Sequence, residues 1–533
     1  MLKTSIVLAV LFVILIPCFT WTYAEDNELF VDVYYSTDLY SNQEKLKKDP
    51  IIVRSRYIQV NFTYLSRKSF PQGMQPIVLN LFHDISLTAV KERVEMRSEK
   101  QYTWYGHVEG MKHSQVVLVI ENGNMVGNIA TEGRVYQIRV VDKGVHVIYE
   151  IDQSSFPEDA PPIPIETPDT SYITPFASQV DDSSIPIIDV MVVYTDDAAR
   201  ASPNIALEIQ LAIDETNQSY INSNINQRLR LVHSAEVPYT ETGDMNADLN
   251  CISSIIDGCL DEIHTWRDTY GADVVSLWVE NGGPYCGMAW LMKLVSTYFQ
   301  QWAFSVVTRS CATGIYAFGH ELGHNMGAHH DRYVTTRLDP NDQGVYPYSH
   351  GYINITGRWR TIMAYNTECS DYGFNCSRLP YWSNPDKLYG GVPMGIPEGQ
   401  ADAADNSKTL NNTAYTVANF RQPMFECDLE PDATVLRRGE TLGFQVTVTN
   451  NTAKYGFVLF ATDVVKPNGL KQPPSGYLIG PLQVNLGPHS TKSGHKSHII
   501  PDNAPLGTYT YRGYVGRSGV IYHKCWFTFE VVE

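Results

Sequence analysis

Residues 320 to 331 contain four histidines and a glutamate, and three of the histidines have spacings that suit a metal centre. They read His-Glu-Leu-Gly-His-Asn-Met-Gly-Ala-His-His-Asp, a match to HExxHxxGxxHD. His320 and His324 are four residues apart, so on a helix they project from the same face, one turn apart along the axis. Two imidazoles placed in this way can bind one ion, and neutral imidazole suits zinc. The spacing therefore predicts a helix that carries a Zn²⁺ site.

The rest of this stretch could complete a site that activates water. His330 is the predicted third ligand, because Gly327 can adopt a positive φ, end the helix and turn the chain back beneath the metal. Three protein ligands leave one coordination position open, which is typical of catalytic zinc. Glu321 follows the first ligand and can take a proton from bound water. The alternative is a degenerate site that binds metal without turnover.

A later methionine strengthens the catalytic interpretation. The segment Thr361-Ile362-Met363-Ala364-Tyr365, together with the extended histidine motif, resembles the metzincin metallopeptidases, whose Met-turn forms the floor of the zinc site. The resemblance implies that Met363 is this floor residue. Taken alone, Met363 would be an ordinary core methionine.

Two neighbouring residues point to different metzincin groups. Asp331, directly after the third histidine, resembles the adamalysins or reprolysins. Tyr365 instead gives a Met-x-Tyr turn, which resembles the astacins and serralysins, where the tyrosine can ligate zinc and swing away to stabilise the tetrahedral intermediate. Tyr365 has that role or, alternatively, packs or makes a plain hydrogen bond. Asp331, Gly327 and Met363 are the predicted structural residues of the site.

The whole pattern, including the strand at 189–195, looks most like the peptidyl-Asp metalloendopeptidases and related reprolysin-like enzymes over residues 187–422. This resemblance implies protein or peptide substrates that are cleaved on the amino side of Asp. Such a preference needs a cation in the pocket just beyond the scissile bond. Arg358 and Arg360, shortly before the Met-turn, are the candidates, although a solvated surface pair is the alternative.

The sequence Cys286-Gly287-Met288-Ala289-Trp290-Leu291 resembles the edge strand with which metzincins hold an extended peptide. Backbone pairing with this strand would align the scissile bond. The predicted substrate-binding residues are Gly287, Met288, Ala289 and Trp290. The apolar composition of the segment also fits an interior strand.

Composition shifts along the 533 residues predict a multidomain chain. The expected parts are a signal peptide (1–24), a β-rich propeptide (25–155), a linker and processing region (156–185), an α/β metzincin catalytic domain with a twisted sheet and an active-site helix (186–424), and a C-terminal Ig-like β-sandwich (425–533). The linker is rich in Pro, Asp, Ser and Thr and is expected to be exposed. In the catalytic domain, a strand at 187–194 precedes a helix that Ser202 and Pro203 are expected to begin.

The N-terminus has the charge and hydropathy pattern of an export signal. Lys3 precedes an apolar run from Ile6 to Ile16, and a polar stretch ends at Ala24. A membrane anchor would need roughly 20 apolar residues, and Pro17 interrupts this run early. We therefore expect a secreted, extracellular protein with no membrane span in the mature chain.

The cysteines fit export. Eight of the nine follow the signal peptide, and an even set in an exported protein implies disulfides. Many connectivities are possible, and closeness in the sequence favours Cys251–Cys259, Cys286–Cys311, Cys369–Cys376 and Cys427–Cys525. Because no cysteine lies between Ala24 and Cys251, a propeptide that inhibits the enzyme must use a carboxylate or steric cover. The candidate carboxylates, which could also mark self-cleavage points, are Glu158, Asp159, Asp181 and Asp182.

A formal net charge of −18 argues against nucleic acid or an anionic membrane as the main partner. No nucleophile motif accompanies a recognisable serine or cysteine triad. The sequence thus predicts a secreted zinc-dependent endopeptidase that is made as a precursor, with its own propeptide as a possible inhibitor. The alternative is a catalytically silent zinc-binding or adhesion protein with a metzincin-like domain.

Overall fold

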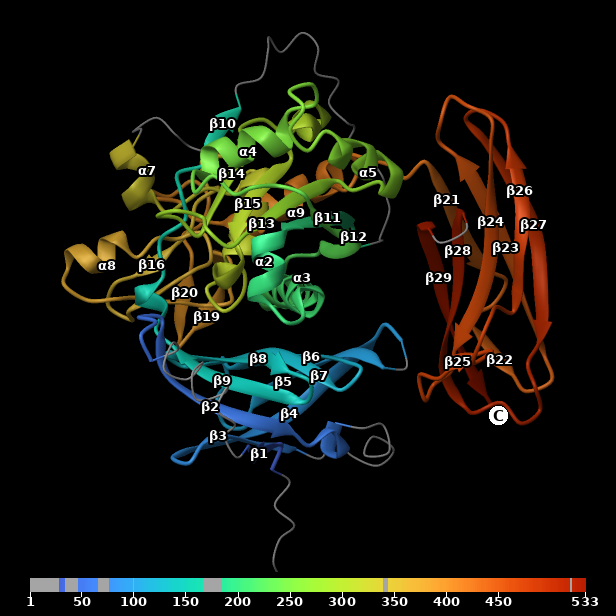
Figure 1. Cartoon of the computed structure of the whole chain (residues 1–533), viewed down its shortest axis with the longest axis horizontal. Helices are drawn as coiled ribbons and strands as arrows, with labels where there is room; N and C mark the ends of the chain where they lie inside the picture. Colours follow the sequence, from blue (N-terminus) through green and yellow to red (C-terminus); the bar gives the residue numbers. More distant parts are fainter. Residues whose placement is uncertain are drawn as a thin grey trace, which may run out of the picture.

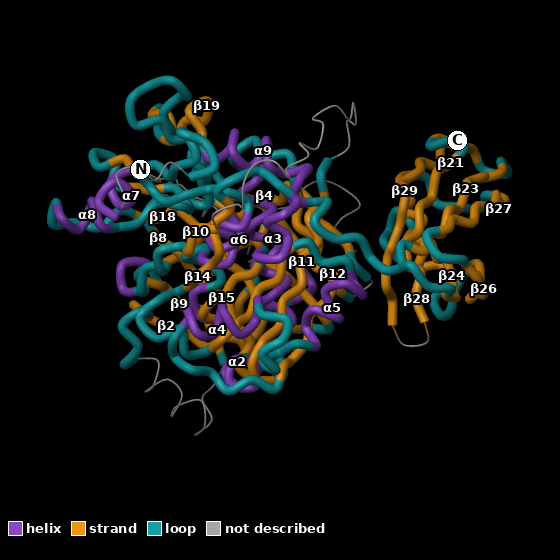
Figure 2. Tube along the Cα trace, turned by 90° about the horizontal axis from the view of Figure 1, so that it is seen from above, coloured by secondary structure: helices purple, strands orange, loops and turns teal. Residues whose placement is uncertain are grey.

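The computed structural model of the chain describes residues 28–33, 47–65, 76–98, 100–165, 185–338, 344–517 and 520–533. The expected signal peptide, Asp181 and Asp182 lie outside these ranges. Figure 1 shows an N-terminal sheet below an α/β unit and a separate group of C-terminal strands at one side. Seen from above in Figure 2, the C-terminal strands again stand beside the rest of the molecule. The chain is multidomain and rich in strands, as the composition shifts predict.

The N-terminal strands form one nine-stranded sheet in which every neighbouring pair is antiparallel. Asn122 and Gly123, with φ values of 51° and 81°, make the tight turn between β6 and β7, as an Asn-Gly hairpin requires. In sheet order the strands are β1 (Phe30–Asp32), β2 (Ile52–Val60), β9 (Val145–Ile151), β8 (Arg134–Asp142), β7 (Asn124–Thr131), β6 (Gln115–Glu121), β5 (Gln101–Val108), β4 (Ile85–Met96) and β3 (Ile77–Phe82).

The two faces of this sheet pack differently. One face encloses its own apolar cluster, which includes Trp104 and Leu118. On the other face Tyr105 and Val117 pack against Leu207 and Leu211 of helix α3 (Ile205–Asn222). Figure 1 accordingly shows α3 between the N-terminal sheet and the α/β unit. The N-terminal sheet is therefore docked on the unit that carries the histidines.

The α/β unit is built on a six-stranded sheet whose inner strands are continuous buried runs, as expected for strands covered on both faces. Only the β14–β15 pair is antiparallel. In sheet order the strands are β10 (Ile163–Ile165), β14 (Gly287–Met292), β15 (Phe304–Thr308), β13 (Val274–Val279), β11 (Ile187–Thr195) and β12 (Arg228–Val237). The helices are α2 (Asp196–Ala201), α3, α4 (Met245–Ser253), α5 (Glu262–Tyr270), α6 (Ala317–Asn325), α7 (Arg332–Leu338), α8 (Thr367–Asp371) and α9 (Asn406–Val417).

The start of α3 differs from the prediction. Ser202 ends the short helix α2, and Asn204 caps α3 by accepting a hydrogen bond from the Leu207 N–H. The expected N-cap at Ser202 is wrong because Asn204 is as strong a capping residue and lies directly before the apolar stripe.

The prediction of an exposed linker is wrong for residues 156–165, which we call the connecting segment. Asp159 and Ala160 are buried, and residues 163–165 form β10, which pairs with β14 in parallel. The polar, proline-rich composition that favoured a linker did not reveal this burial, because the backbone and carboxylates of the segment find partners in the α/β unit. Residues 166–184 lie outside the described ranges.

The C-terminal strands form two sheets that share one apolar core. The first sheet contains β21 (Phe425–Pro431), β23 (Thr441–Asn450) and β27 (Ser490–Ile499). The second contains β22 (Val435–Arg437), β29 (Val520–Val532), β28 (Gly507–Arg517), β24 (Gly456–Val465), β25 (Lys471–Gln472) and β26 (Ile479–Leu486). The Cys427–Cys525 disulfide links β21 of the first sheet to β29 of the second.

All four disulfides predicted from spacing are confirmed. Three lie in the α/β unit: Cys251–Cys259, Cys286–Cys311 and Cys369–Cys376. The Cys369–Cys376 bridge closes the loop between two short strands, β17 (Trp359–Arg360) and β18 (Ser377–Arg378), which pair in parallel; β16 (Ile353–Asn354) completes this small sheet. None of the described helices is long and apolar enough to cross a membrane.

Candidate active site

Helix α6 carries His320, Glu321 and His324 in the buried interior of the α/β unit. It ends at Asn325, and Gly327 then has a φ of +86°, which a residue with a side chain rarely adopts. Gly323 allows a close approach to the Met-turn, since an added Cβ would lie 2.8 Å from the Met363 sulfur. Gly327 thus allows the chain to turn after α6, and Gly323 allows α6 to pack closely against the Met-turn.

The three histidines converge on one point. Their Nε2 atoms are 3.1 Å apart for His320–His324, 3.0 Å for His320–His330 and 3.0 Å for His324–His330. Nδ1 of His320 lies 2.9 Å from the Ile362 carbonyl, and Nδ1 of His324 lies 2.9 Å from the Ala328 carbonyl. A carbonyl only accepts, so each of these Nδ1 atoms carries the proton and each Nε2 presents a lone pair.

This arrangement fits a metal ion. Burial lowers the pKa of His320 and of His330 well below the usual range, so both rings are neutral. The lone pairs of His320 and His324 face each other 3.1 Å apart with no proton between them, and a cation among the three Nε2 atoms would stabilise them. The cluster is one of the two groups among the described residues that could hold a metal.

Glu321 lies beside this cluster, and both of its carboxylate oxygens are buried without a hydrogen-bond partner among the described residues. Burial, with a smaller contribution from the nearby Asp159 charge, raises the pKa of Glu321 well above its usual range. A carboxylate that is held dry and unpaired beside three metal-type ligands is available to receive a proton. This environment is typical of a general base.

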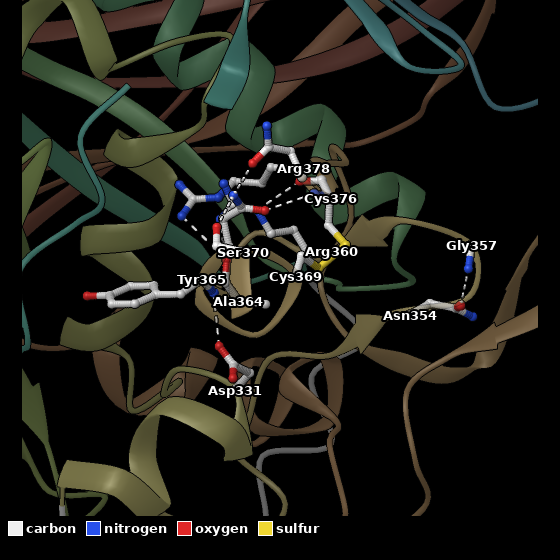
Figure 3. Close-up of a disulfide and its surroundings, with 12 residues drawn as sticks. Asp331, Asn354, Gly357, Arg360, Ala364, Tyr365, Cys369, Ser370, Cys376 and Arg378 are labelled. Carbon is white, nitrogen blue, oxygen red and sulfur yellow. Dashed lines mark hydrogen bonds between the residues drawn. A yellow bond between two sulfur atoms is a disulfide. The ribbon is translucent and has the colours of Figure 1, made fainter. Parts of the chain in front are cut away.

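Asp331 and Met363 hold the floor of the cluster in place. One carboxylate oxygen of Asp331 accepts a hydrogen bond from the Tyr365 N–H at 2.9 Å, and the other accepts from the Val334 N–H at 3.2 Å. Figure 3 shows the bond from Asp331 to the Met-turn. Met363 is fully buried below α6. Asp331 therefore ties the end of the histidine motif to the turn that contains Met363.

Tyr365 reaches the cluster with its ring and its hydroxyl. The ring centroid lies 4.1 Å from that of His330. The hydroxyl donates to the backbone carbonyl of Asp159 at 2.5 Å. The phenol is thus within reach of a peptide carbonyl held next to the histidines, and burial raises its pKa well above the usual range, which keeps it protonated and able to donate.

Strand β14, which contains Gly287, Met288, Ala289 and Trp290, runs past Glu321. A Cβ at Gly287 would collide with the Glu321 carboxylate, so the strand and the acid can approach this closely only because residue 287 is glycine. The other side of β14 pairs with the connecting segment: Ala160 N–H donates to the Gly287 carbonyl at 2.8 Å, and Cys286 N–H donates to the Glu158 carbonyl at 3.1 Å. Apart from that segment, β14 is the edge of the described sheet.

The two predicted arginines separate in the structure. The Arg358 guanidinium lies over the Phe374 ring, 4.6 Å from its centroid. Arg360 is buried, and Figure 3 shows it beside Arg378, with both side chains directed at the Ala364 carbonyl. Arg378 was missed by the sequence analysis. The only feature of the sequence that could have indicated Arg378 is its position two residues after Cys376, in the segment that follows the Met-turn.

Arg378 pairs with the connecting segment. Its guanidinium lies 2.9 Å from the Asp159 carboxylate, which itself lies 3.5 Å from Nδ1 of His320. The latter contact is not an ion pair, because the His320 ring is neutral. Burial acts to lower the pKa of Arg378, but Asp159 and Glu158 outweigh it and raise the pKa, whereas burial lowers the pKa of Arg360 to about 10. Asp159, His320 and Glu321 form the second group that could hold a metal.

Known proteins are similar to this chain in sequence. The family model described as "Metallo-peptidase family M12" matches residues 186–383. The chain is 36% identical over 359 residues to a peptidyl-Asp metalloendopeptidase of Stenotrophomonas maltophilia (strain R551-3), a match that covers 62% of this chain and 80% of the relative. It is 35% identical over 354 residues to the Xanthomonas campestris pv. campestris enzyme of that name, with 63% and 80% coverage.

A shorter relative, the peptidyl-Asp metalloendopeptidase of Pseudomonas fragi, is 34% identical over 209 residues, which is 39% of this chain and the whole of the relative. The identity and coverage of these matches show the family, and the histidine cluster supplies the metal-binding group that such an enzyme needs. The chain is therefore a metalloendopeptidase, and it belongs to the metzincin-like family of the peptidyl-Asp metalloendopeptidases.

Proposed function

We propose that this protein is a secreted zinc-dependent endopeptidase in which His320, His324 and His330 hold the metal and Glu321 is the general base. The observation that carries this proposal is the convergence of three Nε2 atoms, within 3.0 to 3.1 Å of one another, beside the unpaired Glu321 carboxylate. Other chemistries fit this combination less well: the neutral His320 and His330 rings are poor acids, and the eight cysteines among the described residues are in disulfides.

The protein groups divide the remaining work. Bound zinc would supply a Lewis acid and lower the pKa of a water molecule. Glu321 takes the proton of the attacking water and passes it to the leaving amine. The Tyr365 hydroxyl, which donates to a backbone carbonyl in this structure, donates to the carbonyl oxygen of the scissile peptide. Met363 and Asp331 keep the turn below the metal rigid.

We further propose that residues 25–155 are a propeptide and that the connecting segment inhibits the enzyme. Two contacts support inhibition: the segment occupies the hydrogen-bonding edge of β14, and its Asp159 lies against Glu321 and His320. A substrate backbone would need the same edge, where main-chain hydrogen bonds give affinity. Residues 1–24 as a signal peptide and residues 425–533 as an Ig-like β-sandwich domain are also part of this proposal.

The names of the relatives, together with the buried arginines next to the metal ligands, support a preference for Asp at the residue after the scissile bond. An acidic side chain at that position would approach Arg360 and Arg378, where a guanidinium can bind a carboxylate with two parallel hydrogen bonds.

The decisive experiment measures hydrolysis of a denatured protein by the purified wild type and by Glu321→Ala, with metal content determined for both. We expect Glu321→Ala to retain stoichiometric zinc and to lose activity by about 10³-fold, and we expect a chelator to abolish wild-type activity until zinc is restored. Glu262→Ala, on an exposed part of α5, is the matched control and should behave as wild type. Equal, chelator-insensitive activity in all forms would reject the zinc mechanism, and zinc without turnover in wild type would identify a silent binding protein.

A further inference from the structure

Arg360 and Arg378 form a buried cationic pair beside the metal ligands. They are register partners in the parallel strands β17 and β18, and both side chains are almost completely buried. Arg360 donates to the Ala364 carbonyl at 2.6 Å, and Arg378 donates to the Ile315 carbonyl at 3.0 Å. Figure 3 shows how the Cys369–Cys376 disulfide closes the loop that holds them. The chain thus holds two positively charged side chains next to each other in its buried interior.

A buried cation is stable only when it is paired. Among the described residues, the ion pairs of these two guanidiniums go to Glu158 and Asp159 alone, at 2.9 Å for Arg378–Asp159, 3.5 Å for Arg378–Glu158 and 3.6 Å for Arg360–Glu158. Both acids belong to the connecting segment. A chain from which this segment has moved away leaves the pocket without its counter-charges, so any peptide that replaces the segment must bring an acid.

The contacts of the Asp159 backbone show that this acid lies next to the place where a substrate peptide bond would react. The Asp159 carbonyl accepts from the Tyr365 hydroxyl, and Ala160, the next residue, is bonded to β14 at Gly287. The Asp159 side chain leaves this backbone directly into the arginine pocket and is completely buried there. Its carboxylate stands in for an acidic side chain of a substrate residue that adjoins the reacting peptide bond.

Resting on the proposed endopeptidase function, we propose that Arg378 is the specificity-determining residue, and that it recognises the Asp side chain of the substrate residue that follows the scissile bond. Arg360, the register partner of Arg378 in β17, provides a second positive charge beside it. Glu158 differs from Asp159 because a third of its side chain is exposed. It also accepts a hydrogen bond from the Asn366 N–H at 2.8 Å. Glu158 therefore lies nearer the surface than Asp159. Because the Asp159 side chain is completely buried against Arg378, we expect the shorter Asp side chain to bind there better than Glu.

The test compares kcat/KM for matched peptides that carry Asp, Asn, Glu or Ala at this position. The enzyme is used in the form purified after expression of the full chain, with its termini determined by mass spectrometry. We expect wild type to prefer Asp to Asn by about 100-fold or more, as expected for a lost charge-assisted bidentate contact. Arg378→Gln should reduce this ratio to within about threefold of unity, by losing activity on the Asp peptide while keeping its activity on the Asn peptide. Arg378→Lys should keep part of the preference.

The matched control is Arg358→Gln, at the arginine that packs on Phe374; its Asp/Asn ratio should equal that of wild type. A merely structural role of Arg378 would lower the rates on both peptides together, and an unchanged ratio in Arg378→Gln would overturn the proposal. A wild type that hydrolyses all four peptides equally would also overturn it. Failure of wild type to hydrolyse any peptide in the presence of zinc would instead count against the proposed function.

A second measurement applies if Arg378→Gln does not fold. In a full chain that carries Glu321→Ala, limited proteolysis of the connecting segment is compared for Asp159→Asn and, as a control, Glu158→Gln. We expect cleavage to accelerate by about tenfold or more with Asp159→Asn and by less than about twofold with Glu158→Gln, because Asp159 is completely buried at 2.9 Å from Arg378 whereas Glu158 is partly exposed at 3.5 Å. Equal protection in wild type and Asp159→Asn would show that the pocket does not select a carboxylate and would overturn the proposal.

Discussion

At the scale of single residues, Gly287 determines whether Glu321 can take its position. Any Cβ at residue 287 would overlap the carboxylate, so we expect Gly287→Ala to displace Glu321 without touching the histidines. A displacement of about 1 Å in catalytic geometry can lower kcat by about 100-fold. Steady-state kinetics together with zinc analysis check this: kcat should fall by that factor while zinc stoichiometry stays at the wild-type value.

Gly494→Ala is the control for this glycine substitution, because Gly494 has open space around it and no positive φ. Its kinetics should match wild type. If Gly287→Ala turns over as fast as wild type, then either Glu321 moves freely or it is not the base.

Tyr365 has a role that can be separated from packing. Because its hydroxyl donates to a peptide carbonyl while its ring contacts His330, Tyr365→Phe removes the donor and keeps the ring. We expect kcat to fall by about 10² to 10³, the usual cost of one lost oxyanion donor, with little change in KM or zinc content. A fall in zinc content or a change confined to KM would instead assign Tyr365 to metal retention or substrate binding.

The sequence predicted His320, His324 and His330 because helical spacing and one glycine determine their relative positions within a few residues. It could not predict Arg378, whose neighbours in space, Arg360, Ala364 and Asp159, are distant or unremarkable in sequence. Arg358 and Arg360 look equivalent in the sequence, yet only Arg360 is buried in the pocket. Arg358 precedes β17 and has a φ of 54°, whereas Arg360 lies in β17 and pairs with Arg378 of β18. Two-residue strands leave no detectable pattern in the sequence.

At the scale of elements, the contact between the connecting segment and β14 is the predicted source of latency. Ala160 is fully buried and donates to Gly287, and proline at this position would remove the donor and introduce a steric clash. We expect Ala160→Pro to raise the peptidase activity of the uncleaved chain by at least about tenfold, the equivalent of about 1.4 kcal/mol. Initial rates on a quenched peptide, with chain integrity followed by gel electrophoresis, measure it.

Pro161→Ala is the neighbouring control, since Pro161 is exposed and has no N–H to lose. Its uncleaved chain should stay as inactive as wild type. Full activity of the uncleaved wild type would rule out inhibition by this segment.

The elements themselves were predictable to different degrees. The buried runs at β11 and β13 are apolar except for Asp189, Thr195 and Ser276, and such runs are typical of strands in a parallel sheet. β10 is only three residues long and includes a proline, so nothing local marks it as a strand. Its structure comes from the partner strand β14, which a sequence pattern cannot supply.

At the scale of the whole molecule, α3 connects the N-terminal sheet to the catalytic unit. One apolar stripe of α3, including Ile209 and Ile213, faces the core of the α/β unit, as is typical of an amphipathic helix. A second stripe, Leu207 and Leu211, packs on the N-terminal sheet. The Asp214 carboxylate of α3 also lies 3.1 Å from the guanidinium of Arg97, the residue directly after β4 of that sheet. The second contact was not predictable, because acidic and polar residues on a helix usually indicate a solvated face.

Glu215, the neighbour of Asp214, makes this docking dependent on pH. Its carboxylate accepts from Asn128 of the N-terminal sheet at 2.8 Å and from the Gly314 N–H at 3.0 Å. Burial raises its pKa from 4.5 to about 7, although these bonds and the charge of Arg139 oppose the rise. The folded state therefore binds the proton more tightly than the unfolded state, so the stabilisation is present below pH 4.5 and is lost as pH rises toward about 7.

The rise in the pKa of Glu215, from 4.5 to about 7, corresponds to about 3 kcal/mol. We expect the free energy of unfolding of the Glu321→Ala full chain, measured with urea, to fall by up to this amount between pH 5 and pH 7.5, and Glu215→Gln to remove most of that fall because its side chain stays neutral. Glu236→Gln, at an exposed site, should keep the wild-type slope. If the Glu215→Gln variant and the chain without that change lose stability equally over this pH range, the proton is not held at Glu215. Glu215 would then not make the docking of the N-terminal sheet on α3 dependent on pH.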